Sequence, residues 1–131
     1  MTQHAKGTFE VRFEPQSLGD READAALARV ALSKQFHGGL EAISRGEMLS
    51  ATSAVDGSAG YVAIEQVTGS LDGHRGTFIL QHSGVLTRGE AKLTVIVVPD
   101  SGTDGLVGLT GQMSIEVVEG RHSYDLEYDR T

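Results

Sequence analysis

Apolar and polar residues alternate along most of this chain. In residues 7–14, Phe9, Val11 and Phe13 fall on one side of an extended backbone and polar residues fall on the other. The same two-residue period recurs in 109–118 and 122–129. Because successive side chains of a strand point to opposite faces, a period of two indicates a strand with one buried face. The pattern therefore predicts an all-β protein.

Turn signals divide the rest of the chain into further strands. Extended segments are expected at 40–53, 61–69, 77–86 and 91–98. The segments 55–60, 71–74, 87–90 and 119–120 each contain glycine, which supplies the positive φ angles of tight turns. Strands joined by such short turns pair in antiparallel fashion with their neighbours. Seven strands are predicted in this way.

Residues 20–36 allow two interpretations. Their Ala, Leu, Arg and Glu content favours a helix, with Ser17 and Asp20 as capping signals. An extended backbone would instead place apolar residues on one face: Ala26, Ala28, Val30, Leu32 and Phe36. If the segment is extended it is the eighth strand, and eight antiparallel strands close most naturally into a barrel without free edges.

The segment 93–98 is apolar on both faces. Leu93, Val95 and Val97 form one face, and the other comprises Thr94, Ile96 and Val98. Barrel strands whose outer face meets water should alternate, so a second apolar face indicates a covered exterior. A partner subunit is the simplest cover. We therefore expect a homo-oligomer, a dimer or a trimer.

Composition narrows the class of protein. The 131 residues are expected to form one domain, 1–131, and the lack of cysteine excludes disulfides and thiolate sites. With 11 basic and 18 acidic residues, the net charge of −7 does not favour nucleic acid or an anionic membrane as partners. The polar N-terminal residues do not resemble a targeting signal, which suggests a cytoplasmic protein.

Local motifs do not point to a metal or a cofactor. The loop that starts at Asp100 resembles a calcium loop, but its third and twelfth positions are Gly102 and Gly111, where oxygen ligands are required. The five histidines are not spaced as local metal pairs. We expect the loop 99–108 to bind neither calcium nor phosphate and to connect two strands at one mouth of the barrel.

Two ionisable residues lie inside apolar strands. Glu65 is in the middle of 61–67, and His82 shares a strand face with Phe78 and Leu80, whereas Gln81 faces the opposite way. If both point into the lumen, burial would raise the pKa of Glu65 and pairing with His82 would oppose that shift. Such a pair can move a proton. The alternatives are a structural buried pair and exposure on the outer face.

Several stretches together resemble a known bacterial family. They are FHGGLEAIS (36–44), GYVAIEQVTGSLDG (60–73), GTFILQHSG (76–84), VVPDSGTDGLVGLTG (97–111) and YDLEYD (124–129). The chain resembles the domain-of-unknown-function family DUF3224, with a small departure at 73–76. The resemblance implies an oligomeric, eight-stranded antiparallel barrel similar to that of allene oxide cyclase, with 26–36 as a strand. It implies no activity.

Three functions are compatible with such a barrel. The first is binding of a small apolar or amphipathic molecule in the lumen. The second is a cofactor-free isomerase, cyclase or hydrolase that uses Glu65 and His82 as catalytic groups. The third is a structural oligomer with a filled core and no ligand. The candidate ligand contacts are inward-facing side chains: Tyr61, Phe78, Leu80, Met113 and Tyr124.

Overall fold

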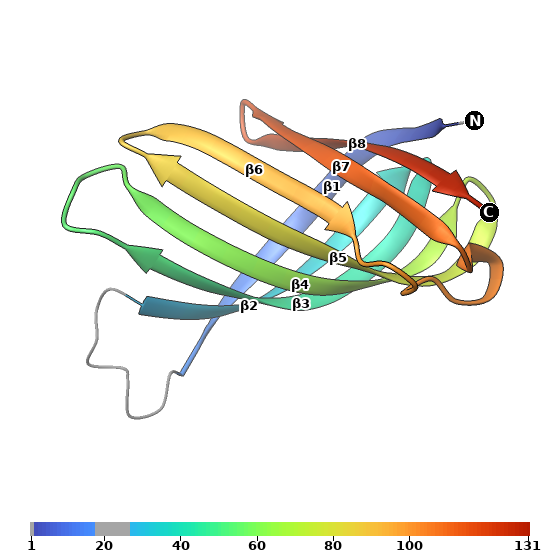
Figure 1. The fold of residues 1–131 in the computed structure, drawn as a ribbon, viewed down its shortest axis with the longest axis horizontal. Helices are drawn as coiled ribbons and strands as arrows, with labels where there is room; N and C mark the ends of the chain where they lie inside the picture. Colours follow the sequence, from blue (N-terminus) through green and yellow to red (C-terminus); the bar gives the residue numbers. More distant parts are fainter. Residues whose placement is uncertain (1, 18–26) are drawn as a thin grey trace.

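The computed structural model describes residues 2–17 and 27–131, which form a closed antiparallel barrel (Figure 1). Its strands are β1 (Gln3–Gln16), β2 (Leu27–Gly38), β3 (Leu40–Thr52), β4 (Ala59–Leu71), β5 (His74–Thr87), β6 (Glu90–Val97), β7 (Leu109–Val118) and β8 (Arg121–Arg130). Each strand neighbours the next in the chain, and β1 pairs with β8 to close the sheet. The predicted eight-stranded antiparallel barrel is confirmed.

The ambiguous segment is a strand from its first described residue, Leu27. It pairs with β1 on one side and with β3 on the other. Leu32 and Phe36 are buried in the barrel. Hydrogen bonding on both edges and burial of one face override the local helix preference. The preceding residues, 18–26, lie outside the described part of the chain.

Most of the turns are tight, and the strands extend further than the alternation predicts. Asp72 and Gly73 join β4 to β5 with φ angles of 46° and 88°. Arg88-Gly89 and Glu119-Gly120 repeat this pair of positive φ angles. Two consecutive positive φ angles give the turn whose twist matches that of paired strands. The hairpins therefore keep pairing up to the turn residues.

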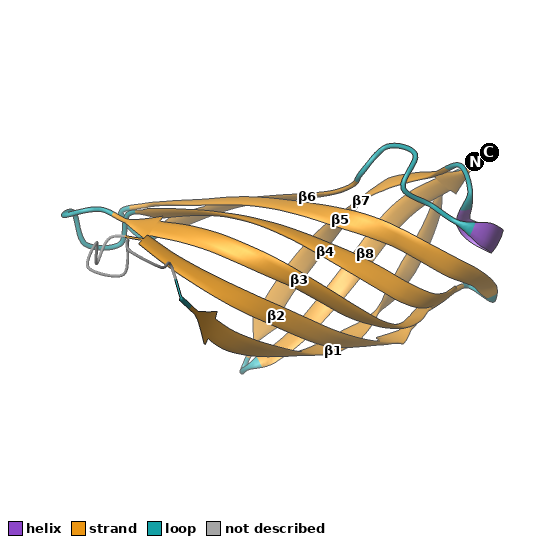
Figure 2. Cartoon of the chain, turned by 90° about the horizontal axis from the view of Figure 1, so that it is seen from below, coloured by secondary structure: helices purple, strands orange, loops and turns teal. Residues whose placement is uncertain are grey.

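One end of the barrel is closed. Large side chains from several strands are buried there: Phe36, Leu40, Leu71, Phe78, Leu80, Leu126 and Tyr128. The connection between β6 and β7 crosses this end and includes the short 3-10 helix η2 (Asp104–Leu106), whose Leu106 is also buried (Figure 2). The loop 99–108 thus connects two strands at a barrel mouth, as predicted. Among the described residues, no helix has both the length and the apolar character needed to cross a bilayer.

The other end is open to solvent. Phe13 and Val117 share the inward face of their strands with buried Phe9 and Met113, yet they are 56% and 58% exposed. Inward-facing Leu86 and Leu93 are exposed as well. Inward-facing apolar side chains become exposed only where nothing packs against them, so water reaches the lumen from this side. These four residues define the open mouth.

The barrel wall is uneven in its hydrogen bonding. β6 pairs with β5 from Leu80 to Thr87, and β7 pairs with β8 along its whole length. Within the part of the chain that the structure describes, β6 and β7 pair only at Ile96 and Gln112. We call the boundary between them the β6–β7 seam.

The sequence predicts an oligomer contact on the outer face of 93–98, and we propose that this contact includes the outward residues of β6. Outward Ile96 lies opposite Gln81, which in turn lies opposite exposed Ile64 on β4. We expect Ile96→Lys to dissociate the oligomer, because an unpaired charge is costly to bury in an interface. Sedimentation at micromolar concentration tests this, with Ser33→Lys on the outer face of β2 as the control. A monomeric parent protein would contradict the prediction.

Candidate functional site

Four consecutive strands each direct one buried polar side chain into the lumen. The residues are Lys34 on β2, Ser44 on β3, Glu65 on β4 and His82 on β5, and all four are buried. The register places Lys34 opposite Ser44 and places His82 opposite Ala63, two residues along β4 from Glu65. Because inward positions repeat every second residue, these neighbouring strands bring the four side chains together. We call them the charged cluster.

Glu65 is the centre of the charged cluster. Its Oε1 accepts hydrogen bonds from Lys34 Nζ at 2.8 Å and His82 Nε2 at 2.5 Å, and its Oε2 accepts one from Ser44 Oγ at 2.5 Å. The Glu65 side chain is 0% exposed, and those of Lys34 and His82 are 7% and 6% exposed. A carboxylate this deeply buried requires such partners. The contact predicted between Glu65 and His82 is confirmed.

A glycine makes room for the carboxylate. Gly46 on β3 lies directly opposite Glu65. A Cβ atom at position 46 would lie 2.7 Å from Glu65 Cβ and 2.2 Å from the carbonyl oxygen of Ile64. Any larger residue there would push β3 and β4 apart. The local sequence therefore leaves the space that the buried Glu65 side chain occupies.

The environment of Glu65 favours its charged form. Burial alone raises the pKa of this carboxyl group. The hydrogen bond from His82, the positive charge and hydrogen bond of Lys34, and the hydrogen bond from Ser44 outweigh burial and lower the pKa to about 2. Glu65 is therefore an anion at neutral pH.

Aromatic rings support the ammonium group of Lys34. Its Nζ lies 4.9 Å from the ring centroid of Phe9 and 5.8 Å from that of Phe36. The two rings are themselves 5.4 Å apart. The negative faces of aromatic rings attract a cation, and the attraction strengthens where water is excluded. Lys34 is therefore held between a carboxylate and two rings.

One nitrogen of His82 remains available to the lumen. Nε2 bonds Glu65, whereas Nδ1 makes no hydrogen bond to any described residue. Every described side-chain nitrogen or oxygen that is shielded from solvent has a hydrogen-bond partner, so Nδ1 retains contact with solvent. When Nε2 donates to the carboxylate, the neutral imidazole presents Nδ1 as an acceptor. The cluster can therefore accept a hydrogen bond, or a proton, from a molecule in the lumen.

The predicted ligand contacts separate into three places. Phe78, Leu80 and Tyr124 lie in the packed closed end, where the Tyr124 hydroxyl donates to the carbonyl of His37 at 2.9 Å. Met113 is buried beside the β6–β7 seam. Tyr61 is half-buried towards the open mouth, and its ring occupies the space above Gly84. Their roles as ligand contacts stay predictions.

Sequence analysis misses two members of the charged cluster, Lys34 and Ser44. A signal for Lys34 exists, because it lies between Leu32 and Phe36 on the apolar face of the strand interpretation. Ser44 follows Leu40 and Ala42 on the inward face of β3. A polar residue on an apolar face is the same signal that identifies Glu65 and His82.

The donor atoms of the cluster do not suit a metal ion, because an ammonium group occupies one side of the carboxylate. Within residues 2–17 and 27–131, no group of three or more His, Asp or Glu residues is arranged to hold a metal. The chemistry available at this site is that of an imidazole, a carboxylate and an ammonium group.

Comparison with known proteins identifies the family. Residues 5–128 match the family described as a protein of unknown function, DUF3224. A crystal structure of a protein of unknown function from the same family, from Shewanella oneidensis MR-1, is 44% identical in sequence and has a TM-score of 0.92. The match covers 100% of this chain and 99% of the Shewanella chain. No curated protein matches this sequence. The chain belongs to the DUF3224 family.

Proposed function

We propose that the barrel binds a small amphipathic molecule in the open half of its lumen, with the polar group of the molecule against His82 and Lys34. The observation that carries this proposal is the position of the charged cluster. It lies between the packed closed end and an apolar, solvent-accessible mouth. Polar groups at the base of an apolar pocket orient a ligand, whereas the apolar walls supply most of its buried area.

The walls suit the apolar part of such a ligand. Between the cluster and the mouth, the inward side chains are half-buried: Val11, Val30, Met48, Tyr61 and Ile115. Beyond them lie the exposed residues of the open mouth. The chain thus leaves apolar surface in contact with water on the inside of the barrel, and covering it with a ligand is favourable.

The cluster favours a neutral hydroxyl, amine or carbonyl over a second charge. Lys34 and Glu65 already balance each other, so an added charge would be desolvated without its own partner. His82 Nδ1 can accept a hydrogen bond from a hydroxyl or N–H group, and Lys34 can donate one to a carbonyl oxygen. The ligand class is therefore an apolar body with one small polar group.

A fluorescent probe and two variants of β5 test the proposal. N-phenyl-1-naphthylamine combines an apolar body with one N–H group, and we expect its fluorescence to rise on binding. Leu86→Asp, which points inward at the mouth, should weaken binding about tenfold or more, because a carboxylate would meet the apolar ligand. Val85→Asp adds the same charge to the outer face and should leave binding unchanged.

The two substituted positions are matched in exposure, since Leu86 is 41% and Val85 is 51% exposed. Both variants should therefore fold alike. Equal weakening in the two variants would place the probe outside the lumen. A complete lack of probe binding by the parent protein, together with no small molecule in native mass spectra of freshly purified protein, would contradict ligand binding itself.

A second candidate function is a cofactor-free isomerase. The observation in its favour is the 2.5 Å bond from His82 to ionised Glu65, which leaves Nδ1 open to the lumen. Such a pair can take a proton from a ligand and return it to another position, and this chemistry needs no co-reactant. Turnover that depends on the carboxylate of Glu65 distinguishes this function from simple binding.

A further inference from the structure

The β6–β7 seam leaves the edges of two strands without a neighbour. Beyond the pair of Ile96 with Gln112, the segments 91–95 and 113–118 have no partner across the seam among the described residues. Each of these strands is paired on its other side only, with β5 or β8. Unpaired strand edges present rows of N–H and C=O groups that can template an additional strand.

A groove of about 620 Å³ follows the seam. Its lining includes inward side chains of both strands, Leu93, Val95, Met113 and Ile115, and outward side chains of β6, β7 and β8, which are Thr94, Gln112, Ser114, Asp125 and Glu127. The groove therefore extends through the wall of the barrel. One of its sides is apolar and the other is polar.

We propose that the β6–β7 seam binds an extended peptide as an additional strand, in which apolar residues alternate with basic ones. A small apolar molecule could fill the groove but could not satisfy two rows of backbone groups. A peptide backbone satisfies both rows, and pockets for alternate side chains then provide specificity. The apolar residues of the peptide would face the lumen side of the groove.

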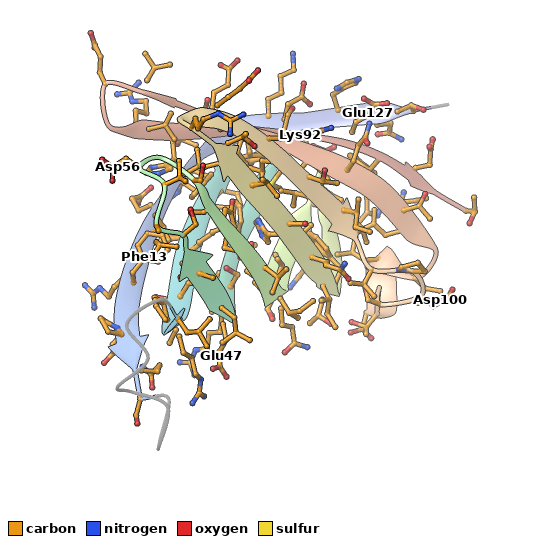
Figure 3. All side chains as sticks on the ribbon, turned by 60° about the vertical axis from the view of Figure 1, so that its left-hand side comes forward. Phe13, Glu47, Asp56, Lys92, Asp100 and Glu127 are labelled. Carbon is orange, nitrogen blue, oxygen red and sulfur yellow. The ribbon has the colours of Figure 1, made fainter. Side chains whose placement is uncertain are left out.

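The acidic side chains along the outer side of the groove favour a peptide whose outward residues are basic. Glu127 on β8 and Lys92 on β6 point away from the barrel (Figure 3). The alternation of buried residues along β7 and β8 places Glu116 and Asp125 on the outer face as well. Asp125 already lies 2.9 Å from His4 Nδ1 and 3.9 Å from Lys6 Nζ, so Glu116 and Glu127 are the more available acidic groups. Glu127 has no ion pair with any described residue. Lysine or arginine side chains on the outer face of the added strand would therefore find acidic partners.

A labelled octapeptide in which valine and lysine alternate is a suitable probe, with fluorescence anisotropy as the measurement. The control peptide has equal charge but carries proline in place of two valines, because proline cannot complete the hydrogen bonds of a strand. We expect the alternating peptide to bind at least about tenfold more tightly than the control. Equal affinity would mean that charge alone attracts the peptide and would overturn the proposal.

A second measurement locates the peptide. The chain has no cysteine, so Thr94→Cys with Ser114→Cys introduces one thiol on each side of the seam. If the pairing of Ile96 with Gln112 is continued by two residues along each strand, these positions lie opposite each other, so a disulfide between them would close the seam. A disulfide between them should weaken peptide binding about tenfold or more, and reduction should restore it. Unchanged binding by the oxidised protein would overturn the proposal.

Hydrogen exchange of the parent protein decides the question even if the disulfide does not form. Bound peptide should slow amide exchange in 91–95 and 113–118, and protection elsewhere without protection there would overturn the proposal. The groove shares Leu93 and Ile115 with the lumen, but the two proposals have separate measurements, because amide protection in 91–95 and 113–118 reports peptide binding and Leu86→Asp reports probe binding. Failure of the peptide test therefore leaves the proposed lumen function intact, and the reverse also holds.

Discussion

Replacing Glu65 with leucine should lower the free energy of unfolding by about 3–5 kcal/mol. The substitution leaves the ammonium of Lys34 buried with two aromatic rings and no carboxylate. Removal of one partner from a buried ion pair is far more costly than removal of the pair, because the remaining charge stays desolvated. Urea unfolding at pH 7 measures the loss.

Two further variants test whether the loss of stability comes from the unpaired charge of Lys34. Glu65→Leu combined with Lys34→Met replaces the pair by apolar side chains and should recover much of the lost stability. Glu47→Leu removes the exposed partner of Arg29 and should cost much less, because solvent screens that pair. If Glu65→Leu is no more destabilising than Glu47→Leu, the buried carboxylate does not balance Lys34.

Acid should destabilise the barrel through the same carboxylate. The pKa of Glu65 is about 2 in the folded barrel against about 4.5 in the unfolded chain, so the unfolded state binds the proton more readily. The stabilisation is complete above pH 4.5, declines as the pH falls from 4.5 to 2, and is absent below that. Its size is on the order of 3 kcal/mol.

Glu65→Gln isolates this contribution from that of other carboxylates. The free energy of unfolding of the variant should lack the part of the acid dependence that belongs to Glu65. Unfolding curves for both proteins between pH 2 and pH 6 provide the comparison. Parallel pH dependences would show that the pKa of Glu65 is not lowered by folding.

Glu65 and His82 could be identified from the sequence because each is an ionisable residue inside an unmistakable strand. An unpaired charge on an apolar face is strongly disfavoured, so two such residues imply a pair. The alternation around His82 places it on one face with Phe78 and Leu80, whereas both faces of 61–67 carry apolar residues. The side to which Glu65 points, and with it the contact, therefore remained a hypothesis until the strands were seen in the barrel.

Lys34 could not be identified by the same argument, because the hydrophobic pattern of its segment fits both a helix and a strand. A helix interpretation of 20–36 was equally open because helix propensity is real there, so the strand face on which Lys34 interrupts the apolar residues was not established. Ser44 was not identified for a different reason. A serine on an apolar strand face carries no charge, so its presence there does not imply a partner. Both positions became informative only when β2 and β3 were seen beside β4.

The open mouth and the β6–β7 seam cannot be predicted from the alternation of apolar and polar residues within single strands. Phe13 and Val117 continue the same alternation as the buried residues before them, although nothing packs on them. Likewise, strands 91–98 and 109–118 look equally capable of pairing with each other. Where a barrel closes depends on shape and stagger around the whole sheet, which single segments do not encode.

The seam also changes how the molecule is held together. β6 and β7 are adjacent in the chain, yet among the described residues they pair only at Ile96 and Gln112. The two ends of the chain, by contrast, lie on paired strands, with Gln3 opposite Tyr128. A circular permutant that links the present termini and opens the chain between β6 and β7 would keep nearly every ladder intact. The natural chain order and this permuted order would therefore form the same sheet with nearly the same strand pairing. The loop between β6 and β7 is the covalent connection across the seam.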